Sequence, residues 1–136
     1  MSKPKLEWEA EYSVGVELID NQHKKMFETI NALIDSIDNF PTQEKLNDII
    51  QRLIAYKKFH FSTEEKYFDE FDYEFTEEHK AKHEEFSKKV DEIVASGKED
   101  VLSLAFSLVD FLEDWLIHHI LKEDQKYVKC FKEHGL

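Results

Sequence analysis

Four stretches of the sequence place apolar residues at alternating steps of three and four, the spacing of one face of an α-helix. The stretches cover about residues 19–38, 42–68, 75–96 and 99–130. Only three glycines and two prolines interrupt the 136-residue chain, too few for the many turns of a sandwich or barrel. A chain of this kind buries its apolar stripes by packing helix against helix.

The short connections between these stretches favour one simple arrangement. We predict an all-α protein, an up-down-up-down antiparallel four-helix bundle, formed as a single domain over residues 1–136. Residues 1–18 have no helical period, and we expect an extended N-terminal arm that lies on the bundle. Thr42 and Thr76 stand where N-caps of the second and third helices are expected.

Charge and composition narrow the classes of partner. Thirty acidic and 18 basic residues give a net charge of −12, which repels nucleic acid and anionic lipid surfaces. Asp110, Glu113 and Asp114 interrupt the most apolar run, so we expect no membrane insertion. The start lacks the apolar region of a secretory signal, and the single cysteine, Cys130, allows no internal disulfide. We therefore predict a cytoplasmic protein.

Polar residues occupy core positions of the apolar stripes. Five histidines and one glutamate fall there: His23, His60, Glu64, His79, His83 and His119. Each imidazole or carboxylate that is buried without a partner costs on the order of a few kcal/mol. Together they would exceed the roughly 5–15 kcal/mol of net stability of a typical domain. A bound metal compensates by taking the lone pairs and balancing the carboxylate charge.

The positions of these residues along the four helices add a second argument. The histidine of the first predicted helix lies near its start, and the histidine and glutamate of the second lie near its end. The two histidines of the third lie near its start, and that of the fourth lies late. Any one of them alone fits a solvated face or a satisfied core histidine. In an antiparallel bundle, however, all of them meet at one end, where we predict a metal site.

The fourth helix offers two candidates for a further carboxylate. Glu123 follows His119 by four residues and Asp124 follows it by five. Residues four apart in a regular α-helix lie about 40° from eclipsed, and residues five apart about 140°. Regular spacing therefore prefers Glu123, whereas Asp124 needs a local distortion of the helix or a position across the site.

Five imidazoles and two carboxylates are too many for one metal ion and suit two ions that the carboxylates bridge. Imidazole suits Zn, Cu, Fe and Ni, and carboxylate bridges are typical of iron and manganese. Helical di-iron oxidases carry Glu-x-x-His on two helices, and the core stripes here do not. A histidine-rich site supplies less negative charge, which favours reversible binding over oxidation of a substrate.

Four motifs occur in order along the chain: "WEAEYSVGVELIDNQH", "HFSTE", "HKAKH" and "WLIHHILKEDQKY". They resemble the motifs of the hemerythrin family, and particularly of its single-domain bacteriohemerythrins. In that family the motifs read Trp…Gly…Ile-Asp-x-Gln-His, His-x-x-x-Glu, His-x-x-x-His and Trp-Leu-x-x-His-Ile-x-x-x-Asp-x-x-Tyr. The resemblance covers nearly the whole chain. One departure is His118, where the family usually has another polar residue.

The resemblance implies a ligand set and selects Asp124 over Glu123. Two iron ions would be bridged by Glu64 and Asp124 and by an oxo or hydroxo group. Three histidines would complete one iron: His79, His83 and His119. Two would hold the other and leave it an open position for O2: His23 and His60. Four apolar side chains would line the O2 pocket and exclude water: Phe61, Trp115, Leu116 and Ile120.

We therefore expect a dioxygen-binding di-iron protein and not an enzyme. It would transport, store or deliver O2 as a monomer, to a protein acceptor that the sequence does not identify. The alternatives are a module that senses O2 or nitric oxide through a partner, a di-iron oxidase or peroxidase, and a zinc-stabilised bundle.

Overall fold

A computed structural model describes residues 5–39, 42–96 and 100–136, without the side chains of Ser96, Ile117, Ile120 and Leu121. Every regular element in these residues is a helix, and none of them is a strand. The prediction of an all-α protein is thereby confirmed.

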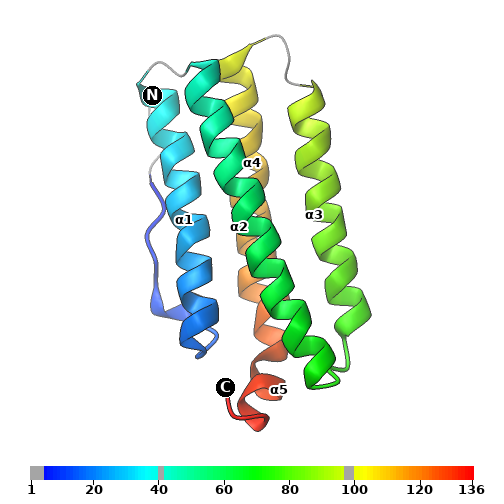
Figure 1. The fold of residues 1–136 in the computed structure, drawn as a ribbon. Coiled ribbons are helices and arrows are strands. Elements are labelled where there is room, and N and C mark those ends of the chain that lie inside the picture. The colour runs from blue at the N-terminus through cyan, green and yellow to red at the C-terminus, as the bar shows by residue number, and fades with distance from the viewer. Residues whose placement is uncertain (1–4, 40–41, 97–99) are drawn as a thin grey trace.

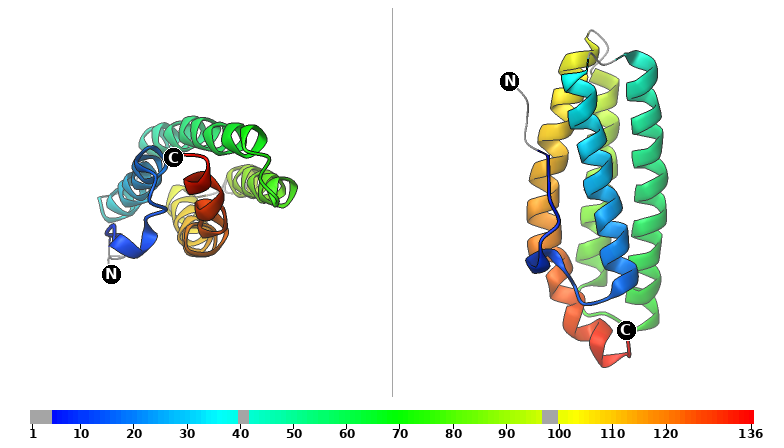
Figure 2. Two further views of the ribbon diagram at one scale, coloured as in Figure 1. Left: turned by 90° about the horizontal axis from the view of Figure 1, so that it is seen from below. Right: turned by 90° about the vertical axis from the view of Figure 1, so that its left-hand side faces the viewer.

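Four long helices lie side by side along the molecule (Figure 1). They are α1 (Glu17–Asp38), α2 (Gln43–Glu70), α3 (Thr76–Ser96) and α4 (Val101–His118). Helices α1 and α3 each pack against both α2 and α4. Each helix runs in the opposite direction to the one before it in the sequence, as the colour gradient of Figures 1 and 2 shows. The bounds of the first three differ from the predicted ranges only at their ends.

The fourth predicted helix differs more. In place of one helix over about 99–130, four helical elements follow one another. They are α4, a π-helix η2 (His119–Glu123), a 3-10 helix η3 (Asp124–Tyr127) and α5 (Val128–Glu133). The change of helix type begins at a predicted site residue, His119, and its consequence is described with the site below.

The helix starts are set by short side chains. The hydroxyl oxygen of Thr42 accepts a hydrogen bond from a backbone N–H at 3.2 Å and caps α2, as predicted. Asp100 caps α4 in the same way, at 3.1 Å. The prediction for Thr76 is wrong. It is the first residue of α3 itself, and its hydroxyl donates to the carbonyl of Tyr73 at 2.6 Å.

The segment before α1 lies along the side of the helices (Figure 2) and contains a short 3-10 helix, η1 (Ala10–Tyr12). The side chain of Asn31 on α1 pairs with the backbone of Leu6 through two hydrogen bonds, of 2.7 and 2.9 Å. Trp8 packs edge-on against Phe27, with ring centroids 5.3 Å apart. These contacts hold the segment against the helices.

Two clusters of buried hydrophobic side chains fill the interior. The larger contains residues of all four long helices, among them Ile30 and Leu108. The smaller lies toward α5 and includes the fully buried Tyr127. On α2, Phe61 belongs to the larger cluster and Phe68 to the smaller. The polar residues between them on α2 therefore lie where the two clusters meet.

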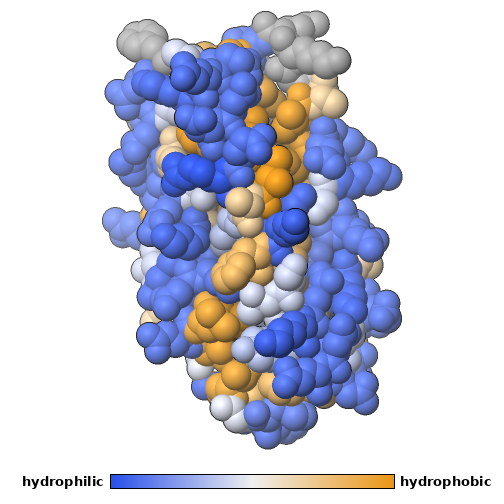
Figure 3. All heavy atoms as spheres, in the orientation of Figure 1, coloured by the Kyte–Doolittle hydropathy of each residue, from blue (hydrophilic) through white to orange (hydrophobic). Residues whose placement is uncertain are grey.

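Hydrophilic residues cover most of the face in Figure 3, and hydrophobic ones form a lengthwise stripe between the helices. This pattern matches the amphipathic spacing of the sequence. Within the described ranges, no helix is both long and apolar enough to span a membrane.

Candidate metal centre

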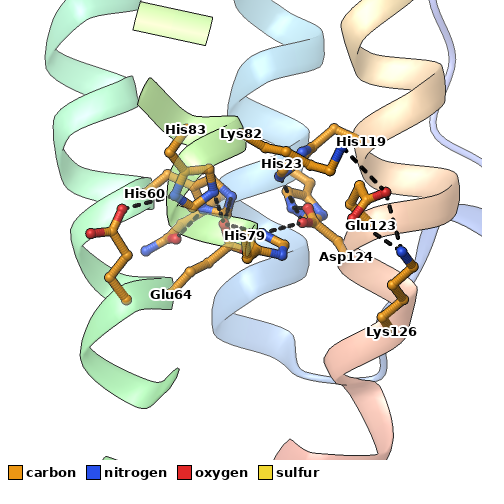
Figure 4. Close-up of polar contacts among 12 residues, drawn as sticks. His23, His60, Glu64, His79, Lys82, His83, His119, Glu123, Asp124 and Lys126 are labelled. Carbon is orange, nitrogen blue, oxygen red and sulfur yellow. Dashed lines mark hydrogen bonds and ion pairs between the residues drawn. The ribbon is translucent and has the colours of Figure 1, made fainter. Parts of the chain in front are cut away.

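Seven polar side chains meet inside the bundle (Figure 4). They are the seven residues predicted from the sequence, each at most 3% exposed: His23, His60, Glu64, His79, His83, His119 and Asp124. Helix α1 contributes one, α2 two and α3 two, and η2 and η3 each contribute their first residue. The structure therefore brings the whole predicted set together.

The potential ligand atoms form two groups, in each of which they all lie within 4.8 Å of one another. The three-histidine group consists of Glu64, His79, His83 and His119. The two-histidine group consists of His23, His60, Glu64 and Asp124. The groups share Glu64, so they are neighbours with a common carboxylate.

Glu64 contacts imidazoles of both groups through one oxygen. Its Oε1 lies 3.2 Å from Nε2 of His60 and 3.1 Å from Nε2 of His83. His60 lies one helical turn before Glu64 on α2, so regular helix geometry aligns the two side chains. His83 reaches the same oxygen from α3.

Asp124 spans the two groups with both of its oxygens. Oδ2 lies 2.8 Å from Nε2 of His23 in the two-histidine group. Oδ1 lies 2.8 Å from Nε2 of His119 and 3.1 Å from Nε2 of His79, both in the three-histidine group. Glu64 and Asp124 therefore both contact histidines of both groups.

The π-helix explains why Asp124 and not Glu123 reaches the site. The backbone N–H of Asp124 bonds to the carbonyl of His119, five residues earlier, which brings residues five apart onto one face. Glu123 turns outward to Lys126, at 3.3 Å, and Lys82, at 3.7 Å. The preference for Glu123 from regular helix spacing is therefore wrong, because the helix is not regular here.

The donor set fits bound cations. Although these atoms lie close together, their angles are not those of hydrogen bonds. Among the described residues, none of the five histidine Nε2 atoms and none of the four carboxylate oxygens has a hydrogen-bond partner. Buried polar atoms in folded proteins are rarely left unpaired. Imidazole nitrogens and carboxylate oxygens that converge in this way suit divalent or trivalent transition metals.

Two of the histidines are held from behind by polar side chains. Nδ1 of His60 lies 2.6 Å from Oε1 of Gln22, whose Nε2 donates to Oγ1 of Thr63 at 3.2 Å. Nδ1 of His83 lies 2.9 Å from Oε2 of Glu65. A hydrogen bond at Nδ1 fixes the ring and leaves the Nε2 lone pair directed at the site.

The pKa shifts of the centre follow from burial and charge. Burial raises the pKa of Glu64, but His60 and the other imidazoles outweigh it and hold that pKa well below its usual range. Burial and Glu64 likewise raise the pKa of Asp124, and the imidazoles, led by His119, lower it well below its usual range. Burial lowers the pKa of His79, but Asp124 and Glu64 overcome this effect and raise it to about 10. In the absence of a cation, the centre therefore keeps charged carboxylates and a proton on His79.

Two of the four predicted pocket residues lie against histidine rings. Phe61 stacks on His83, with centroids 3.7 Å apart and planes 5° apart. Trp115 stacks on His119 at 4.2 Å and 13°. Leu116 is buried in the larger core cluster. The side chain of Ile120 lies outside the described part of the structure.

Sequence reasoning missed Gln22, Thr63 and Glu65. Gln22 is the Gln of the first motif and directly precedes His23, whereas adjacency to Glu64 is the sequence signal for Thr63 and Glu65. His118, which we left out of the site, lies at the surface, where its Nδ1 contacts the backbone carbonyl of Asp114 at 2.8 Å.

Comparison with known proteins agrees with this arrangement. The sequence model of the hemerythrin HHE cation binding domain matches residues 14–131, a range that contains the whole centre. A bacteriohemerythrin of Clostridium acetobutylicum is 34% identical over 125 residues, which are 89% of this chain and 97% of that protein. One of Pseudomonas paraeruginosa is 34% identical over 129 residues, 93% of this chain and 82% of the relative. One of Campylobacter jejuni is 28% identical over 121 residues, 89% and 91% of the two chains. This chain belongs to the hemerythrin family, as its motifs, its cluster of buried potential ligands and its similarity over most of its length show.

Proposed function

We propose that this protein binds dioxygen reversibly at a non-heme di-iron centre and serves to transport, store or deliver it. The observation that carries the proposal is the unequal division of histidines around Glu64, which both groups share, and Asp124, which contacts histidines of both. Three histidines converge on one side and two on the other. Because Asp124 also contacts His79 and His119 of the three-histidine group, the second ion would have one ligand fewer. An ion with an incomplete ligand set has a position at which a small molecule can bind.

The ligand roles follow from the two groups. One iron would be held by three histidines: His79, His83 and His119. The other would be held by two, His23 and His60, which would leave a position for O2. Glu64 and Asp124, which contact histidines of both groups, would help to hold both ions. When bound, the irons supply the electrons for reversible dioxygen binding.

The protein contributes shape, charge balance and exclusion of water. Two buried carboxylates offset part of the positive charge of two ions, which would otherwise be costly in the interior. Phe61 and Trp115 stack on His83 and His119, and Leu116 is buried in the larger core cluster, so the centre borders on apolar surface. Such a surface keeps out water and protons, which promote irreversible oxidation.

The scaffold in this proposal is an up-down-up-down four-helix bundle with an extended N-terminal arm, acting as a monomer in the cytoplasm. We propose a binding protein and not an enzyme, because the centre has two carboxylates and five histidines. Di-iron oxidases of the helical class have more carboxylates.

An optical experiment tests the proposal. The protein is loaded with iron, reduced without air, exposed to O2 and then freed of it, while the visible spectrum and the iron content are recorded. Colour that appears and leaves with O2, at about two irons per chain, supports the proposal. Colour that forms once and persists indicates an oxidase or a redox sensor. A colourless protein that retains zinc indicates a structural metal.

Replacement of Leu116 tests the exclusion of water. We expect Leu116→Ala to accelerate irreversible oxidation of the O2-loaded protein about tenfold, because the smaller side chain lets water enter. A tenfold change in rate corresponds to ~1.4 kcal/mol of activation free energy. The rate is followed as loss of the O2-dependent colour. Leu108→Ala is the matched control, because it removes the same atoms from the same helix two turns away. Equal oxidation rates in the two variants would contradict the role of Leu116.

A further inference from the structure

The two groups differ in what holds their histidines from behind. His60, in the two-histidine group, faces the neutral amide of Gln22. His83, in the three-histidine group, faces the carboxylate of Glu65. The two contacts are of similar length, 2.6 and 2.9 Å, so they differ mainly in charge.

The orientation of the Gln22 amide follows from its other neighbour. The hydroxyl of Thr63 donates to the backbone carbonyl of Phe59 at 2.9 Å, so its proton is already committed. Oγ1 of Thr63 can then only accept from Gln22, which places the NH2 group there and the carbonyl oxygen at His60. Because a carbonyl oxygen only accepts, Nδ1 of His60 carries the proton and Nε2 carries the lone pair that faces the site.

The surroundings of the two acceptors reinforce the difference. Gln22 is buried, with 6% of its surface exposed. The Glu65 side chain is 33% exposed, so its carboxylate keeps part of its hydration. A carboxylate attracts the Nδ1 proton more strongly than an amide does and makes Nε2 of the same ring a stronger electron donor. His83 is therefore the stronger donor of the pair, and His60 the weaker.

We propose that Gln22 and Glu65 are positioning residues that make the two ion positions unequal. Glu65, through His83, favours the higher charge on the ion of the three-histidine group. Gln22, through His60, favours the lower charge on the ion of the two-histidine group. The inference rests on the proposed function for the identity of the metal and the open position. It adds that the ion with the lower charge lies at the open position, where O2 binds and must be released unchanged.

Two nearly isosteric exchanges test the proposal. In the iron-loaded protein without O2, we expect Gln22→Glu to lower the midpoint potential of one ion and Glu65→Gln to raise that of the other. Each change corresponds to about a tenfold shift of the one-electron equilibrium, ~59 mV. In the zinc-loaded protein, Glu65→Gln is expected to release one of two zinc ions to a chelator about tenfold faster, and Gln22→Glu about tenfold more slowly.

Control variants separate this effect from charge alone. Asn21→Asp adds a charge beside Gln22, and Glu84→Gln removes one beside His83, both at exposed positions. We expect each control to leave the potentials and the zinc release close to those of the parent protein. Shifts of the same sign in both test variants, or shifts no larger than those of the controls, overturn the proposal.

The outcomes also distinguish this inference from the proposed function. Opposite shifts in a protein that takes up O2 irreversibly support the unequal positions and refute the carrier. Reversible O2 binding without the shifts supports the carrier and refutes the unequal ion positions. Circular dichroism of each variant, compared with the parent protein, verifies that the helices are intact.

Discussion

We expect His60→Ala to hold about one iron per chain in place of about two and to lose reversible O2 binding. His60 is one of only two histidines in the two-histidine group, and its ring is 1% exposed. With it removed, that position keeps one imidazole and two carboxylate oxygens that also serve the neighbouring ion. The three-histidine group is untouched, so its ion stays bound.

Iron counting and the O2-dependent visible spectrum measure both effects on one sample. His118→Ala is the control, because it removes an imidazole next to the centre at a surface position. We expect it to keep both irons and the full reversible colour. If His60→Ala retained two irons and a normal O2 cycle, the division into two groups would be wrong. His23→Ala is expected to behave like His60→Ala, because His23 is the other imidazole of the same group.

The histidines could be predicted from sequence because burial of an unpaired imidazole is expensive. His23, His60 and His79 stand on apolar stripes, where evenly spaced hydrophobic neighbours predict burial. All three are buried, at 2% exposure or less. The step from burial to a shared site needed only the alternating helix directions, because these place the stripe histidines at one end.

Asp124 could not be predicted from regular geometry. The periodicity argument assumes one helix type throughout, and a π-turn of five residues moves every later side chain to another face. The same apolar residues around His119 are compatible with an α-helix and with a π-helix. The sequence alone therefore carried no signal for the turn. Only the resemblance to the family's motif indicated the aspartate.

Gln22 and Glu65 were missed for a different reason. Polar residues beside a core stripe usually face solvent, and Glu65 stands in a charged run. Whether such a residue meets a histidine depends on where a second helix crosses, since Gln22 on α1 meets His60 on α2 and Glu65 on α2 meets His83 on α3. Contacts between residues far apart in sequence have no periodic signature.

Removal of the metal is expected to lower the melting temperature by about 25 °C. A ligand at 1,000 times its dissociation constant stabilises the folded state by ~4.1 kcal/mol, so two ions give ~8 kcal/mol. For a domain of this size, 1 kcal/mol corresponds to roughly 3 °C. Without cations, buried imidazole and carboxylate atoms lack partners, and bound metal removes this free-energy cost.

Calorimetry of chelated and iron- or zinc-loaded protein measures the difference in melting temperature. His60→Ala is expected to show about half of it and His118→Ala all of it. Loaded and metal-free proteins that melt within a few degrees of each other would contradict a structural role for the ions.

The difference in melting temperature is also expected to grow with pH, for a reason that lies in His79. Burial lowers the pKa of His79, but Asp124 and Glu64 outweigh this effect and raise the pKa in the folded state from an ordinary 6.5 to about 10. A raised pKa stabilises the metal-free fold fully below 6.5, and that contribution is lost as the pH rises through about 10. A cation must displace the same proton, so metal affinity increases as the pH rises from 6.5 to about 10.

Glu64 and Asp124, with lowered pKa values, contribute stability that is lost only when the pH falls below the usual carboxyl range. Melting curves of the metal-free and zinc-loaded forms between pH 6.5 and 10 test the trend, and a difference that stays constant or narrows across that range would show that His79 is not protonated in the metal-free fold.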